Sequence, residues 1–186
     1  MTILLAGIIV WIGIHLIPSL GVEYKQALVA RMGLLAYQAA FALTVLTALG
    51  LIIVGWQSTR PAFVYLPIAE LRPVAIGLVM LAVVLLGATG RATRIGRLVR
   101  FPQLTAILLW ACAHLLANGD SRSLILFGSA ACWAILMMIV ITRREGDWQK
   151  KPAPSWTIEL LGIVLSLAAI AGIVVIHPWI TGMPIF

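Results

Sequence analysis

The chain has 186 residues, of which 62% are hydrophobic and only 10% are charged, and its mean hydropathy is +1.10. A soluble domain carries about 25% charged residues, so this composition excludes an ordinary water-soluble globular protein. The net charge of +7 does not indicate a nucleic-acid partner, because the basic residues lie in short segments between apolar runs.

Six apolar runs are long enough to cross a bilayer as helices, which takes about 20 residues each. Helices are expected because a membrane span must satisfy its own backbone hydrogen bonds, and the alternating segments of a barrel are absent from the sequence. The sequence therefore predicts an all-α integral membrane protein, a single domain over residues 1–186 folded as a six-transmembrane-helix bundle. The predicted spans are 3–20, 33–56, 73–89, 102–118, 123–142 and 157–178.

The basic residues indicate how these spans are oriented. Ten of the thirteen fall in the loops 21–32, 90–101 and 143–156, which lie on one side of the predicted membrane. Because basic residues accumulate in cytoplasmic loops, that side is predicted to be the cytoplasm and both termini to lie outside. The ten are Lys25, Arg31, Arg91, Arg94, Arg97, Arg100, Arg143, Arg144, Lys150 and Lys151, and the other three are Arg60, Arg72 and Arg122.

Two histidines lie inside predicted spans, and each follows a tryptophan by four residues: Trp11 precedes His15, and Trp110 precedes His114. This spacing puts both rings on one helix face. A histidine inside a span is costly and usually faces a partner within the bundle, so both are candidate functional residues. At about 1.5 Å per residue, they lie about 8 Å and about 18 Å above the cytoplasmic boundary. His177 ends the last span, where an interfacial, solvated position is expected.

The two histidines could bind one metal-bearing cofactor, or each could hydrogen-bond a neighbouring helix, and the residues alone leave both open. Zinc is less attractive, because a structural zinc site needs four ligands. Haem b needs only two axial imidazoles. Asn118, one turn after His114, is a candidate to accept a hydrogen bond from the imidazole. Alternatively, this turn only caps helices, with Gly119 ending one and Asp120 beginning the next.

Several segments resemble the signature of the NnrU family, and the resemblance extends over the whole chain. The longest, RFPQLTAILLWACAHLLANGD, runs from Arg100 to Asp120, and SLILFG follows at Ser123. HLIPS begins at His15 and GLLAY at Gly33. The resemblance implies a multi-pass protein of the bacterial inner (cytoplasmic) membrane, linked to denitrification and nitric oxide metabolism. In that membrane, the termini that the basic residues place outside are periplasmic. The family's usual Arg-His-Pro reads Arg-Phe-Pro here, so that histidine is not required for the predicted pocket.

The family is similar to the plant zeta-carotene isomerase, a membrane enzyme that holds haem b between two histidines. The correspondence implies haem b as the cofactor here, with His15 and His114 as the iron ligands and Trp11 and Trp110 lining the pocket. The isomerase has a cysteine just after the tryptophan. This chain has its cysteine one place later, at Cys112, which rotates the thiol by about 100° around the helix.

Polar residues around this pocket complete the predicted site. Arg31 and Arg100 are candidates to pair with the haem propionates, because guanidinium groups suit carboxylates. Asn118 completes the set of cofactor-binding residues. The arginine-rich loop from Arg91 to Arg100 is expected to be a solvated cytoplasmic loop, with binding of anionic lipid or a cytoplasmic partner as the alternative.

Three functions remain open from the sequence. The first is a redox or nitric oxide-responsive haem protein linked to denitrification. The second is a haem-dependent cis–trans isomerase of a carotenoid-like polyene, and the third is a haem-free membrane accessory protein. The sequence has no acid–base pair, nucleophile motif or nucleotide-binding loop, so any catalysis would rest on the cofactor. The expected partners are membrane lipid, haem, and a hydrophobic substrate or a redox partner, without nucleic acid.

Overall fold

The computed structural model describes residues 1–89, 92–150 and 152–183, and within these ranges the regular structure is helical apart from one isolated bridge. Arg91 and Lys151, two of the predicted cytoplasmic basic residues, lie outside the described residues. The chain forms two compact units, Met1–Ala62 and Phe63–Phe186. The helices are α1 (Thr2–Leu20), α2 (Val22–Met32), α3 (Leu34–Ser58), η1 (Ala69–Leu71), α4 (Arg72–Gly87), η2 (Ile95–Arg97), α5 (Pro102–Ala117), α6 (Ser121–Glu145) and α7 (Trp156–Thr181).

Each of the six predicted spans coincides with one helix. Five helical segments are long and apolar enough to cross a membrane, and they contain α1, α3, α4, α6 and α7. The remaining helix, α5, has 16 residues. It is therefore about 24 Å long, less than the hydrocarbon core of about 30 Å. The all-helical membrane fold is confirmed, and six crossings with both termini outside remain a prediction.

The segment 21–32, predicted as a loop, forms the helix α2. Glu23 in its first turn and Arg31 in its last turn both interact favourably with the helix dipole. Gly33 ends the helix at a positive φ of 84°, which a residue with a side chain rarely adopts. The sequence did not predict this helix because the segment lacks an apolar run, although the charges at its two ends favour a helix.

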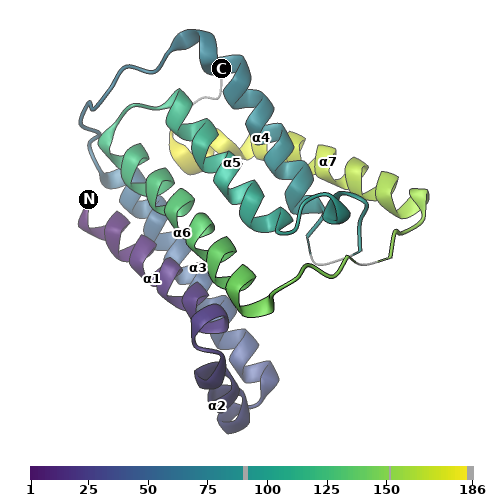
Figure 1. Ribbon diagram of the computed structural model, residues 1–186. Coiled ribbons are helices and arrows are strands. Elements are labelled where there is room, and N and C mark those ends of the chain that lie inside the picture. The colour runs from purple at the N-terminus through teal and green to yellow at the C-terminus, as the bar shows by residue number, and fades with distance from the viewer. Residues whose placement is uncertain (90–91, 151, 184–186) are drawn as a thin grey trace. The chain divides into compact units, whose positions relative to one another are not determined.

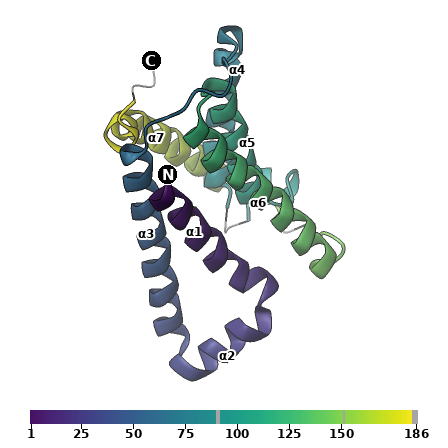
Figure 2. The same cartoon turned by 90° about the vertical axis from the view of Figure 1, so that its left-hand side faces the viewer.

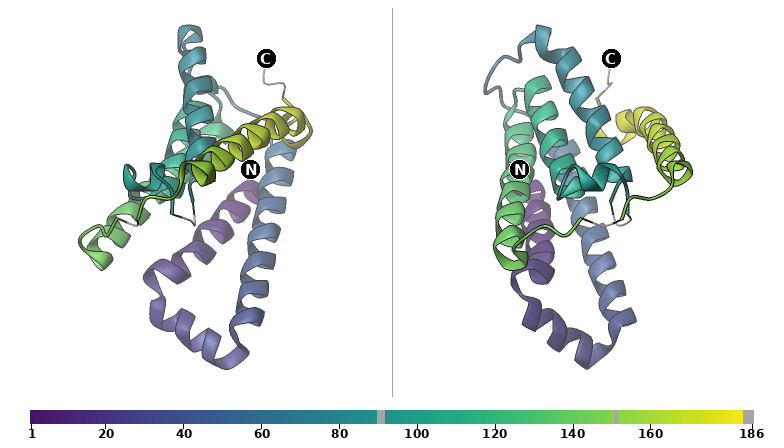
Figure 3. Two further views of the ribbon diagram at one scale, coloured as in Figure 1. Left: turned by 90° about the vertical axis from the view of Figure 1, so that its right-hand side faces the viewer. Right: turned by 45° about the vertical axis from the view of Figure 1, so that its right-hand side comes forward.

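In the first unit, α1 packs against α3 through small residues. Leu4 on α1 and Ala48 on α3 are fully buried. A Cβ added to Gly7 would lie 2.8 Å from the backbone nitrogen of Ile52, so only glycine allows this approach. Gly55 makes a similar contact with the backbone of Leu4. The two helices lie close together near the beginning of α1 and separate toward α2 (Figures 2 and 3).

In the second unit, α4 contacts α5 and α7, and α5 also contacts α6 (Figure 1). Ala82 and Leu85 of α4 meet Ala106 of α5 in the core, and Trp110 packs against this cluster. The small side chains allow α4 and α5 to approach closely. This contact fixes the helix that carries His114.

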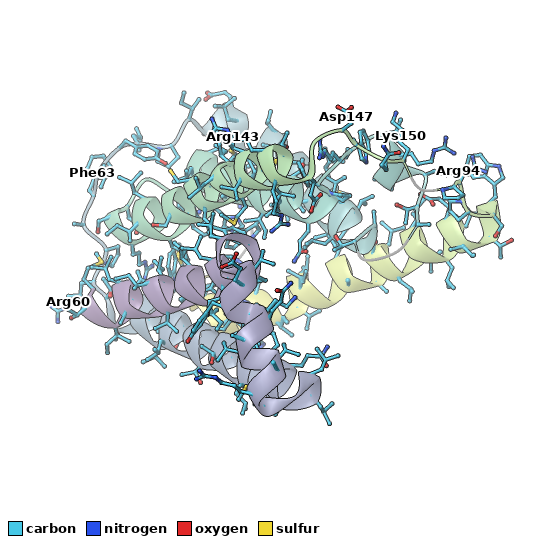
Figure 4. All side chains as sticks on the ribbon, turned by 60° about the horizontal axis from the view of Figure 1, so that its bottom comes forward. Arg60, Phe63, Arg94, Arg143, Asp147 and Lys150 are labelled. Atoms are coloured by element: carbon cyan, nitrogen blue, oxygen red, sulfur yellow. The ribbon has the colours of Figure 1, made fainter. Side chains whose placement is uncertain are left out.

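One end of the second unit collects basic residues. Arg100 Nη2 donates to the carbonyl oxygen of Gly146 at 2.6 Å, which joins the loop before α5 to the end of α6. The Arg94 guanidinium lies 3.9 Å from the centre of the Trp156 ring at the beginning of α7. Figure 4 shows Arg94 beside α7, with Lys150 on the segment that leads to this helix. The basic loops on either side of α5 and α6 thus meet at the same end of the unit.

At the opposite end, the segment after Phe63 crosses over the end of α5. The backbone N–H groups of Val64 and Tyr65 donate to the carbonyl oxygen of Gly119 at 2.9 and 3.0 Å. A Cβ on Gly119 would meet the Tyr65 carbonyl, so glycine is needed for this approach. The C-cap of α5 is Asn118 rather than Gly119. Asp120 caps α6 as predicted, accepting from the backbone of Ser123 at 3.1 Å.

Candidate functional site

His15 lies on α1 in the first unit, half-buried among aromatic rings. Its Nδ1 is 2.7 Å from the carbonyl oxygen of Trp11, one turn earlier. The Trp11 ring is tilted by 35° against the imidazole with 4.3 Å between the ring centres. Phe41 of α3 meets the imidazole edge-on at 5.5 Å. The imidazole is thus held by its own helix and contacted by the neighbouring one.

His114 has the same arrangement on α5 in the second unit. Its Nδ1 is 2.8 Å from the carbonyl oxygen of Trp110, and the two rings lie 5.0 Å apart. Phe127 of α6 stacks on the imidazole at 4.3 Å with an angle of 25°. Phe127 also meets Trp110 edge-on at 4.9 Å. The three rings together define the orientation of the imidazole.

The hydrogen bond to the tryptophan carbonyl sets the tautomer of each histidine. A carbonyl oxygen only accepts, so Nδ1 of His15 and of His114 carries the proton, and Nε2 carries the lone pair. This is the usual state of a metal-ligating imidazole, whose other ring nitrogen donates to a carbonyl or a carboxylate. The donor set therefore fits an iron bound through Nε2.

The described residues contain no cluster of three or more His, Cys, Asp or Glu side chains that could hold a metal ion. A site with one imidazole on each face of a planar cofactor needs no such cluster. The two histidines belong to different units. Their meeting at one cofactor therefore remains a prediction from the sequence.

Asn118 caps the helix in this structure, which is one of the two roles that the sequence leaves open for this turn. Its Nδ2 donates to the backbone carbonyl oxygen of His114 at 2.9 Å, while Trp110 accepts the proton of Nδ1. The Tyr65 hydroxyl adds to this turn, because it donates to the carbonyl oxygens of Leu115 and Asn118. Burial, and then the negative charge of Asp120, raise the pKa of Tyr65, so the hydroxyl stays a donor. Both side chains stabilise the end of the helix that carries His114.

The two predicted propionate-binding arginines lie in different units. Arg31 is exposed in the last turn of α2. Arg100, besides its bond to Gly146, lies over the Phe101 ring at 5.0 Å. His177 lies in the last turns of α7, where its Nδ1 is 3.3 Å from the carbonyl oxygen of Met183. The role of Arg31 and Arg100 in cofactor binding remains a prediction from the sequence.

Comparison with known proteins settles the family. A family described as NnrU protein matches residues 3–185. The chain belongs to the NnrU family. No curated protein and no solved structure matches it.

In this NnrU-family protein, three aromatic residues near the histidines were missed by sequence reasoning. Phe41 and Phe127 contact the imidazoles from neighbouring helices. Tyr37 lies one turn before Phe41, and their ring centres are 6.3 Å apart. Tyr37 is the last residue of the quoted GLLAY segment, so the sequence did contain a signal for it. Phe127 lies in the quoted SLILFG segment, whereas Phe41 lies outside the quoted segments. The contacts of both rings with the imidazoles depend on how the helices pack.

Proposed function

We propose that this NnrU-family protein binds haem b with His15 and His114 as the axial ligands. We further propose that it is a redox or nitric oxide-responsive component of the bacterial inner membrane. The observation that carries the proposal is the same local geometry at both histidines, in which Nδ1 lies within hydrogen-bond distance of a tryptophan carbonyl oxygen. Because the carbonyl only accepts, the neutral imidazole then presents Nε2 as the ligand atom. The link of the family to denitrification gene clusters supports the biological setting.

The residues of the chain have defined tasks in this proposal. The Trp11 and Trp110 carbonyls hold the proton on Nδ1 and thereby present Nε2 as the ligand atom. The aromatic rings beside each imidazole restrict its rotation. Haem b, when bound, supplies an iron that can change its oxidation state or bind a diatomic gas.

The direct test is the optical spectrum of the detergent-purified protein supplied with haem b. We expect a Soret band and, after reduction, sharp α and β bands typical of two axial histidines. His15→Ala and His114→Ala should each remove this spectrum. His177→Ala is the matched control, because it removes the third histidine of the chain and should leave the spectrum intact. A wild-type protein without a Soret band would refute haem binding.

The functions that the resemblance leaves open give different results with the same preparation. A closed electron-transfer site keeps its reduced spectrum when carbon monoxide is added. A site that responds to nitric oxide, or that opens for a polyene, changes its spectrum because a diatomic ligand reaches the iron. Conversion of a cis-carotenoid in a host that accumulates it would then favour the isomerase. A haem-free accessory protein gives no haem spectrum in any of these experiments.

A further inference from the structure

Tyr37 carries a buried hydroxyl that the fold does not satisfy. Its side chain is only 8% exposed. The hydroxyl has no hydrogen-bond partner within residues 1–89, 92–150 and 152–183. More than 90% of buried polar groups have a partner, and an exception calls for a specific explanation such as a bound molecule. A phenylalanine would fill the same space without this cost.

The position of Tyr37 relates it to His15. Tyr37 and Phe41 lie one turn apart on α3, with 6.3 Å between their ring centres. Phe41 in turn meets the His15 imidazole edge-on. Residues four apart lie on the same helix face, so Tyr37 belongs to the face of α3 that contacts the histidine. It lies about 6 Å farther along the helix axis, toward α2.

This end of the first unit favours an anionic group on a bound molecule. Tyr37 lies in the first turn of α3, and α2 packs beside it. Arg31, in the last turn of α2, adds positive charge next to the beginning of α3. A neutral tyrosine hydroxyl is a good donor to a carboxylate, and such a charge-assisted hydrogen bond is stronger than a neutral one.

We infer that the Tyr37 hydroxyl donates a hydrogen bond to a carboxylate at the edge of the planar cofactor whose metal is ligated by His15. The inference rests on the proposed haem binding and adds a residue that selects a cofactor with free carboxylates. Tyr37 is thus a binding residue of the cofactor edge, separate from the iron ligands.

The test compares haem b with its dimethyl ester, in which both carboxylates are blocked. Each is titrated into the full-length wild-type protein, Tyr37→Phe and Tyr24→Phe, and binding is followed by the Soret band. Tyr24 is the matched control, because it is a tyrosine of the same unit that is 59% exposed. We expect Tyr37→Phe to weaken the binding of haem b about tenfold. The dimethyl ester should bind wild type and Tyr37→Phe equally, and Tyr24→Phe should behave as wild type.

Thermal unfolding of the haem-free proteins provides a second measurement. Tyr37→Phe removes an unsatisfied buried hydroxyl, so the haem-free variant should unfold at the wild-type temperature or above it. The inference is overturned if Tyr37→Phe binds haem b as tightly as wild type does. It is also overturned if the variant loses the same factor in affinity for haem b and for the dimethyl ester. Neither result contradicts haem binding itself. A wild-type protein that binds neither compound overturns both proposals.

Discussion

Gly55 is the position at which a single methyl group should disturb the first unit most. A Cβ there would lie 2.5 Å from the Leu4 Cα and 2.9 Å from the carbonyl carbon of Ile3. Both atoms belong to the backbone of α1, so no side-chain rotation can relieve the overlap. The helices must separate, and overpacking of this kind costs about 1–3 kcal/mol. We expect Gly55→Ala to destabilise the protein by about 2–3 kcal/mol, near the upper end of that range.

Gly50→Ala is the control on the same helix. A Cβ at Gly50 would have no other atom of the described residues within 4 Å. Alanine favours a helix over glycine by up to about 1 kcal/mol, so this variant should be neutral or more stable. Unfolding of the detergent-solubilised proteins by added dodecyl sulfate, followed by circular dichroism, measures the difference. Equal midpoints for Gly55→Ala and Gly50→Ala would refute the close packing of α1 on α3.

Three further predictions concern the second unit. Glu159 is buried, and its carboxylate accepts hydrogen bonds from the backbone N–H groups of Arg94 at 2.9 Å and Ile95 at 3.3 Å. Glu159→Gln should lower the free energy of unfolding by about 1–2 kcal/mol and speed tryptic cleavage of the arginine-rich loop. Unchanged cleavage would contradict this role of Glu159. Because the pKa of Tyr65 is raised in the folded protein, its hydroxyl ionises more readily in the unfolded chain. The free energy of unfolding is therefore unaffected below the usual tyrosine pKa of about 10 and falls as the pH rises above it. Tyr65→Phe should abolish this alkaline fall in a pH series of unfolding midpoints, and a fall of the same size in the variant would exclude Tyr65 as its cause. Leu66 and Leu98 are 80% and 82% exposed near opposite ends of the unit. In a cysteine-free background, a membrane-impermeant maleimide should label Leu66→Cys in intact cells and Leu98→Cys only after permeabilisation, and the reverse pattern would invert the predicted topology.

The helices could be predicted from the sequence because apolar runs in a membrane protein leave the backbone few alternatives. The run 102–118 matches α5, Pro102–Ala117, almost to the residue, since Pro102 suits the first turn of a helix. The number of crossings could not be fixed in the same way, because α5 is short for a span. The helix α2 was missed since its polar composition gives no apolar signal.

At the candidate site, the sequence predicts the contacts within one helix but not the contacts between helices. The Trp-x-x-x-His spacing correctly predicts that both rings share a helix face, and helix geometry explains why the tryptophan carbonyl reaches Nδ1. In this structure Nδ1 of His114 bonds the Trp110 carbonyl, and Asn118 takes the capping role, the other of the two roles left open. Phe127 could not be predicted, because its contact with His114 arises from the packing of α6 against α5.

Arg100 illustrates why a residue near a cofactor site can affect binding without touching the cofactor. Its bond to the Gly146 carbonyl joins the beginning of α5 to the end of α6. The stacking of Phe127 on His114 depends on the packing of the same two helices. Loss of haem in Arg100→Ala would therefore follow from a propionate contact or from a shift between the helices. The Tyr37 hydroxyl has no partner among the described residues, so Tyr37→Phe removes no observed bond and reports on the cofactor alone.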